Sequence, residues 1–157
     1  MMSLSIIGLD QKKSETIAKD LNELLANYQI FYMNVRGYHW NIKGEKFFEL
    51  HLKFEELYND LLLKVDEVAE RILTLGYQPE HAYSVYTQHS EITEKLNITD
   101  GKQAVGDIVA SLALLIKKQR AILSLAADAE DEGSSSLMSD YIKEQEKLIW
   151  MYSAFLA

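Results

Sequence analysis

Apolar residues recur every three or four positions along most of this 157-residue chain, which is the spacing of amphipathic α-helices. In chain order the pattern predicts helices over about 10–38, about 45–75, 100 to near 133, and 134 almost to 157. The chain has one Pro and 7 Gly, so these stretches are largely uninterrupted. This feature restricts the chain to a bundle of long helices.

The predicted helix ends carry recognisable signals. Gly76 and Pro79 are stop signals for the second helix. Asp100, followed three residues later by Gln103, resembles a capping box that starts the third helix. The serines at 134–136 are predicted to cap the fourth helix.

Residues 79–99 have a weaker periodicity, which predicts a long crossover that carries one short helix. Such a crossover joins helices that run parallel, whereas short connections join antiparallel neighbours. The expected fold is therefore all-α: a ferritin-like four-helix bundle with a long crossover between the second and third helices. A chain of this length is expected to form a single domain over 1–157.

Composition narrows the possible chemistry. Cysteine is absent, so disulfides and thiolate zinc sites are excluded, and any metal must be bound by His and carboxylate ligands. The formal net charge of −8 argues against a broadly basic nucleic-acid surface and is compatible with attracting cations. No apolar run reaches the roughly 18 residues of a membrane span and no leader pattern begins the chain, so a cytoplasmic protein with no membrane partner is expected.

The second predicted helix carries several ligand-type side chains on one face. Advancing by about 100° per residue from His51 places Glu55, Asp66 and Glu70 within about 100° of it. His51 and Asp66 are 15 residues apart in the sequence. That separation is roughly 22 Å along a helix, whereas metal–ligand bonds are only about 2 Å long. The two ends of the face therefore belong to different metal sites within one subunit.

An antiparallel second copy of this helix resolves the separation. A two-fold axis near residue 60 lays His51 and Glu55 of one chain against the Asp66 and Glu70 ends of the other, which generates two equivalent sites per dimer. The same face also carries apolar side chains that need a partner to cover them: Phe48, Tyr58, Leu62, Ala69 and Leu73. The sequence therefore predicts metal sites between subunits.

His39, near the end of the first predicted helix, can reach the same site because Gly44 lets the chain reverse within a few residues. The resulting ligand set has two imidazoles and two or three carboxylates. Such a set suits Fe(II), Mn(II) or Zn(II), and open coordination positions leave room for an oxidant. Oxidation of iron is the chemistry that this set permits.

Three segments resemble the Dps family of miniferritins: His-Trp-Asn at 39–41, His51, and Asp-Glu-Val-Ala-Glu-Arg at 66–71. The likeness spans nearly the whole chain. It implies a hollow homo-oligomeric shell of twelve subunits, a dodecamer built from two-fold dimers. It also implies that Fe(II) is oxidised, preferably with hydrogen peroxide, and that Fe(III) mineral is stored inside, which protects against oxidative damage.

By the same resemblance, a ferroxidase site lies across the dimer two-fold axis. The resemblance implies that His39, His51, Asp66 and Glu70 are its catalytic residues and metal ligands, with Glu55 as a further ligand. Zn or Mn could occupy the same ligands. Position 55 is Glu where Asp is familiar in the family, which adds a methylene and changes how the carboxylate reaches the iron.

A DNA-binding protein that protects the nucleoid, with secondary metal chemistry, is the alternative function, and a purely structural or signalling helical assembly is a third. Many relatives that condense DNA carry a flexible tail rich in Lys and Arg. Residues 1–15 here offer only Lys12 and Lys13, partly offset by Asp10 and Glu15, which argues against DNA binding.

An ordinary ferritin builds its di-iron site within one subunit from Glu-x-x-His pairs. No His in this chain has a Glu three residues before it, which excludes that site.

Other polar residues have simpler interpretations. Lys64 and Arg71 are expected to pair with neighbours at exposed sites, and Trp40 is expected to pack in the core or an interface. His81 and His89 lie outside the motif, and no metal role is assigned to them.

An acidic run ends the third predicted helix, where the helix dipole disfavours negative charge. The resemblance implies that acids in this region line three-fold pores for Fe(II), and a solvated helix end is the alternative. The acids concerned are Asp128, Glu130, Asp131, Glu132 and, in the next helix, Asp140.

Overall fold

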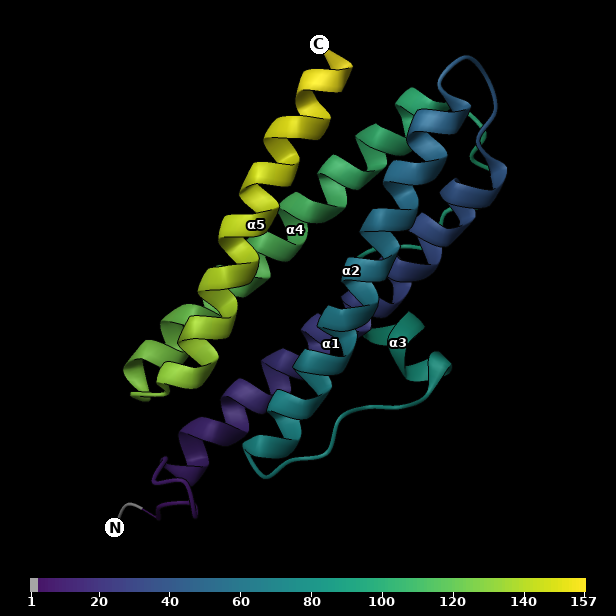
Figure 1. Ribbon diagram of the computed structural model, residues 1–157. Coiled ribbons are helices and arrows are strands. Elements are labelled where there is room, and N and C mark those ends of the chain that lie inside the picture. The colour runs from purple at the N-terminus through teal and green to yellow at the C-terminus, as the bar shows by residue number, and fades with distance from the viewer. Residues whose placement is uncertain (1–2) are drawn as a thin grey trace.

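Figure 1 shows the computed structural model, which describes residues 3–157. Two antiparallel hairpins make up the bundle, and a short helix lies in the crossover between them. The elements are α1 (Gln11–Asn41), α2 (Phe47–Thr74), α3 (Tyr83–His89), α4 (Gly101–Asp128) and α5 (Glu132–Leu156). The all-α prediction, with four long helices and a short helix in the crossover, is confirmed. Within residues 3–157, no helix is both long and apolar enough to span a membrane.

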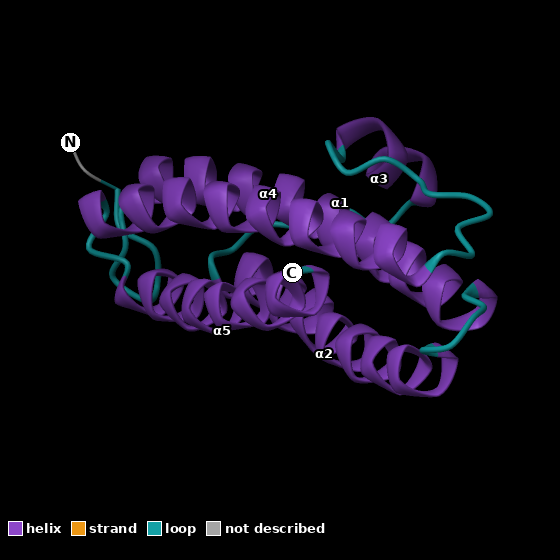
Figure 2. Ribbon diagram, turned by 90° about the horizontal axis from the view of Figure 1, so that it is seen from above, coloured by secondary structure: helices purple, strands orange, loops and turns teal. Residues whose placement is uncertain are grey.

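Helix α1 is the hub of the fold, because it packs against α2, α3 and α4, while α5 packs on α4. Seen from above, α1 and α4 form one layer and α2 and α5 the other (Figure 2). The crossover runs from the end of α2 back along the bundle to the start of α4 (Figure 1). Helices α2 and α4 therefore run in the same direction, as a long crossover requires.

The predicted apolar stripes form the core. The buried members on α1 and α2 are Ile17, Leu21, Leu24, Tyr28, Phe31, Val35, Phe54, Leu57, Leu61, Val68 and Ile72. Those on α4 and α5 are Val105, Ile108, Leu112, Leu115, Ile122, Ala126, Tyr141 and Tyr152. Each large apolar side chain buried in this way contributes about 1.5–3 kcal/mol, so packing of the stripes supplies most of the stabilisation.

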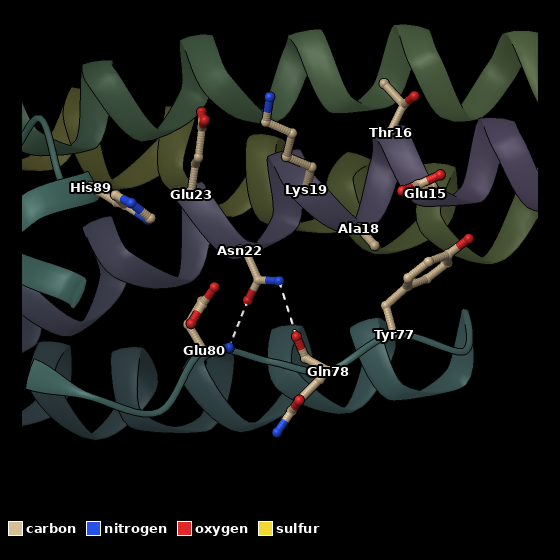
Figure 3. A pocket seen from close by; sticks show the side chains of 10 residues that line it. All are labelled: Glu15, Thr16, Ala18, Lys19, Asn22, Glu23, Tyr77, Gln78, Glu80 and His89. Carbon is tan, nitrogen blue, oxygen red and sulfur yellow. Dashed lines mark hydrogen bonds between the residues drawn. The ribbon is translucent and has the colours of Figure 1, made fainter.

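Three asparagines of α1 hold the crossover through their side-chain amides. Asn22 donates from Nδ2 to the Gln78 carbonyl oxygen at 3.2 Å and accepts from the Glu80 amide at 2.8 Å (Figure 3). Two more asparagines bind backbone groups at 91–95: Asn27 and Asn34. These bonds satisfy backbone groups of a segment that has little regular structure.

The N-cap prediction is confirmed for α4 and wrong for α5. Asp100 caps α4, with its carboxylate accepting from the Gln103 amide at 2.9 Å. Helix α5 is instead capped by Asp131, which accepts from the Ser134 amide at 3.0 Å, so the serines at 134–136 lie inside the helix. The reason is tertiary: Asp131 is only 2% exposed because it also pairs with Arg71.

The ion pair between Arg71 and Asp131 corrects two further expectations: that Arg71 pairs at an exposed site, and that Asp131 lines a pore or a solvated helix end. The Arg71 guanidinium lies 2.6 Å from the Asp131 carboxylate and also donates to Ser134 Oγ at 2.9 Å, so Arg71 does not pair at an exposed site. A Cβ at Gly133 would come within 2.6 Å of the guanidinium, which explains a glycine in the first turn of α5. The Asp131 carboxylate is therefore used in contacts within its own subunit. The other acids of the region are exposed: Asp128, Glu130, Glu132 and Asp140.

Lys64 is also buried, contrary to the prediction of an exposed pair. Its side chain links α2 to α5, because Nζ donates to Asp60 and to Glu144 at 2.8 Å each. Burial alone would lower the pKa of Lys64, but the hydrogen bonds to the two carboxylates outweigh it and raise the pKa above the ordinary 10.5. The ammonium is therefore a charged link between the two hairpins.

A closed ring of hydrogen bonds joins α1, α4 and α5 inside the core. The Tyr28 hydroxyl donates to Gln119, Gln119 Nε2 donates to Gln145 Oε1 at 2.8 Å, and Gln145 Nε2 donates to the Tyr28 oxygen at 2.7 Å. All three side chains are at most 1% exposed. Burial raises the pKa of Tyr28, so its hydroxyl remains protonated and able to donate. The ring fixes the relative register of three helices.

Replacing Gln119 with Leu should destabilise the protein, because the buried Tyr28 hydroxyl loses its acceptor and the buried Gln145 Oε1 loses its donor. We expect the free energy of unfolding to fall by about 2–4 kcal/mol, measured by denaturant titration. Gln103→Leu, at an exposed position of the same helix, is the matched control. Equal stability of the two variants would contradict a stabilising ring.

Replacing Lys64 with Met should also lower stability, because Asp60 and Glu144 lose their shared cation. Since the pKa of Lys64 is raised in the fold, its contribution is complete below the ordinary pKa of 10.5 and disappears as pH rises through the higher folded value. The difference in unfolding free energy between wild type and variant should therefore be constant from about pH 6 to about pH 9 and shrink only at more alkaline pH. A difference that shrinks across neutral pH would contradict this assignment.

Candidate metal centre

The corner between α1 and α2 brings His39 and His51 together. His39 lies in the last turn of α1 and His51 near the start of α2. The turn between them passes through Gly44, whose φ of +115° is a conformation that favours glycine. Across this turn the two imidazole rings stack, with centroids 3.7 Å apart and planes inclined by 13°. The prediction that His39 reaches the neighbourhood of His51 therefore agrees with the geometry.

Each histidine is fixed by the backbone of the other. His39 Nδ1 lies 2.6 Å from the His51 carbonyl oxygen, and His51 Nδ1 lies 2.7 Å from the His39 carbonyl oxygen. A carbonyl oxygen can only accept, so each Nδ1 carries a proton and donates it. An imidazole that carries its single proton on Nδ1 has a lone pair at Nε2, and this is the form in which imidazole binds a metal. We call this arrangement the histidine lock.

Aromatic rings support the histidine lock. Phe47 stacks on His51, with centroids 4.9 Å apart and an interplanar angle of 21°. Tyr58 meets His39 edge-on, at 5.2 Å and 81°. His39 is only 7% exposed, and these contacts limit the freedom of both imidazoles to rotate.

Glu55 lies one helical turn beyond His51 and is turned toward Tyr58. The Tyr58 hydroxyl donates to Glu55 Oε1 at 3.3 Å. Burial of the phenol, followed by the neighbouring Glu55 charge, raises the pKa of Tyr58, so the hydroxyl stays protonated. Tyr58 is thus buried within its own subunit, although its place on the helix predicted that another subunit would cover it.

Arg36 is a neighbour that the sequence patterns did not reveal. Its guanidinium lies 4.3 Å from the Tyr58 ring centroid, 5.1 Å from that of Trp40 and 5.7 Å from that of Tyr32. Trp40 was expected to pack either in the core or in an interface. It is 58% exposed, so it does not pack in the core of the subunit. The spacing of Tyr32, Arg36 and Trp40 at every fourth residue is the signal that places them on one face of α1.

Asp66 and Glu70 lie apart from the histidine lock, toward the other end of α2, and both are exposed. Within residues 3–157 of one subunit, no three His, Asp, Glu or Cys side chains converge closely enough to hold a metal ion. The structure therefore brings His39 and His51 together and does not bring Asp66 or Glu70 to them.

Several large apolar side chains of α2 are exposed beside these groups. They are Phe48, Leu52, Leu62, Leu63 and Leu73, with exposed fractions of 49–79%. A helix that exposes so many apolar side chains is typical of an interaction surface.

A groove of 670 Å³ between α1 and the crossover has a different composition (Figure 3). It is lined by Glu15, Thr16, Ala18, Lys19, Asn22, Glu23, Tyr77, Gln78, Glu80 and His89. None of the five predicted ligands is among these residues, so the groove and the candidate metal centre are separate places on the described chain.

Comparison with known proteins identifies the family. The Ferritin family model, a ferritin-like domain, matches residues 18–157. The chain is 56% identical to an uncharacterized protein of Haemophilus influenzae, over 98% of this chain and 96% of that one. It is 41% identical to the DNA protection during starvation protein of Porphyromonas gingivalis, over 97% of this chain and 96% of that one.

Solved structures give the same result. The Dps protein of Vibrio cholerae O1, described as a member of a broad superfamily of ferritin-like diiron-carboxylate proteins, superposes with a TM-score of 0.97 at 54% identity, covering 100% of this chain and 99% of that one. A Dps protein of Bacillus brevis has a TM-score of 0.90 at 29% identity, covering 93% and 98%. The match thus extends over both hairpins and the crossover, and the chain belongs to the Dps family within the ferritin-like superfamily.

Proposed function

We propose that this protein is an iron-oxidising and iron-storing miniferritin whose substrates are Fe(II) and hydrogen peroxide. The observation that carries the proposal is the histidine lock, which holds two imidazoles side by side through their Nδ1 atoms and does not use Nε2 in these bonds. The description of the Vibrio cholerae relative as a ferritin-like diiron-carboxylate protein supports iron as that metal. Zn(II) and Mn(II) would compete for the same ligands.

The proposed site lies between subunits. His39, His51 and Glu55 contribute from one chain, and Asp66 and Glu70 of the partner subunit complete the site. The exposed carboxylates and exposed apolar side chains of α2 support this arrangement, because a two-fold axis near residue 60 would cover the apolar face and join the two halves. The proposed assembly is a dodecamer of such dimers.

The chemistry of such a site follows from its donors. Two Fe(II) ions each give one electron to one hydrogen peroxide molecule, two protons are consumed, and two Fe(III) ions and two water molecules result. Because both electrons are delivered, the O–O bond is cleaved without release of a hydroxyl radical. Neutral imidazoles bind Fe(II), and the carboxylates offset the additional charge of Fe(III).

A mixing experiment tests both the ligands and their division between subunits. Neither His39→Ala/His51→Ala nor Asp66→Ala/Glu70→Ala should oxidise Fe(II) faster than a protein-free solution. Coexpression of the two variants should restore oxidation, because each mixed dimer contains one intact site. With statistical pairing, about a quarter of the wild-type sites are restored, and stopped-flow absorbance after addition of peroxide measures them.

His81→Ala, which removes an exposed histidine outside the site, is the matched control and should oxidise Fe(II) at the wild-type rate. Activity in the His39→Ala/His51→Ala variant equal to wild type would reject the proposed site. Two inactive variants that stay inactive when mixed would reject its division between subunits.

Protection of DNA would then be chemical rather than by coating. The Porphyromonas gingivalis relative is a DNA protection during starvation protein, but this chain has a net charge of −8 and no Lys or Arg among residues 1–10, which precede α1. We expect no gel shift of duplex DNA at about 150 mM salt, because repulsion between phosphates and an acidic protein opposes binding. A shift that weakens as salt rises would favour DNA coating instead.

A further inference from the structure

Tyr58 contacts two of the ligand-type residues at once. Its hydroxyl donates to Glu55 Oε1 at 3.3 Å, and the edge contact between its ring and the His39 ring has a centroid distance of 5.2 Å. Tyr58 as a whole is only 8% exposed.

The Tyr58 ring is held in place from the α1 side. The Arg36 guanidinium lies 4.3 Å from the ring centroid, and Tyr32 meets the ring edge-on at 6.2 Å and 85°. A ring enclosed by a cation, an aromatic edge and an imidazole has little freedom to rotate, so the direction of its hydroxyl is fixed.

We propose that Tyr58 is a positioning residue that holds Glu55 and His39 for metal binding. This inference rests on the proposed function. A Glu side chain has one more rotatable bond than Asp, and fixing it costs conformational entropy at the moment of binding. The hydroxyl at Oε1 restrains Glu55 beforehand and leaves Oε2 to bind the ion.

The proposed role of Tyr58 also explains why position 55 is Glu and not the shorter Asp. Tyr58 lies three residues after Glu55, so the two side chains are neighbours on the surface of α2. The additional methylene of Glu is what carries the carboxylate to the phenol at this spacing. An Asp at position 55 would be a shorter ligand that does not depend on Tyr58.

Titration with Co(II) under anaerobic conditions, followed by calorimetry and visible absorbance, tests the coupling between the two residues. Tyr58→Phe removes only the hydroxyl and should weaken Co(II) binding about tenfold, as loss of a hydrogen bond to a metal ligand typically does. In a Glu55→Asp background the same substitution should change the affinity less than about twofold, since the shorter carboxylate does not use the phenol.

Tyr77→Phe is the matched control, because it also removes a hydroxyl hydrogen bond, to the Gln11 carbonyl oxygen at 2.8 Å, near the opposite end of α2. It should leave Co(II) affinity unchanged. Circular dichroism verifies that all variants are equally helical.

Two results would overturn the inference alone: wild-type affinity in Tyr58→Phe, or an equal loss of affinity in the Glu and Asp backgrounds. Absence of saturable Co(II) binding by the wild-type protein would instead reject the proposed function, and this inference with it. The two failures are therefore distinguishable in one set of titrations.

Discussion

The reciprocal hydrogen bonds between His39 and His51 are the constraint that fixes both the corner between α1 and α2 and the arrangement of the candidate site. Each ring uses its Nδ1 proton to tie the end of α1 to the start of α2, and Nε2 takes no part in these bonds. The same two residues therefore close a corner of the bundle and are the imidazoles of the proposed site. Helix α1, which packs on three other helices, transmits the position of this corner to the rest of the bundle.

Helical periodicity predicted the long helices and most of the core, because amphipathic stripes are local in sequence. The errors at the start of α5 and at Lys64 have a common cause. Asp131 caps α5 because Arg71 of α2 holds its carboxylate, and Lys64 is buried because Glu144 of α5 receives its ammonium. Both depend on contacts between residues at least 60 positions apart in the sequence, which no local pattern records.

The candidate site was also predictable only where it depends on local sequence, and not where it depends on contacts between helices. Helix geometry was sufficient to place the ligand-type residues of α2 on one face and to separate His51 from Asp66. It could not predict that Tyr58 turns inward to Glu55, because that orientation depends on Arg36 of the neighbouring helix. The sequence thus indicated which residues to propose for the site, and the packing of α1 on α2 determines how His39, His51 and Glu55 are held.

The closed ring of Tyr28, Gln119 and Gln145 has a consequence for how such proteins diverge. Around the ring, each side chain donates one hydrogen bond and accepts one. A change at one position interrupts the circuit for the other two, so drift at any single member is disfavoured while the others remain. These three positions, distributed over three helices, should therefore be inherited together or be exchanged together for an apolar set.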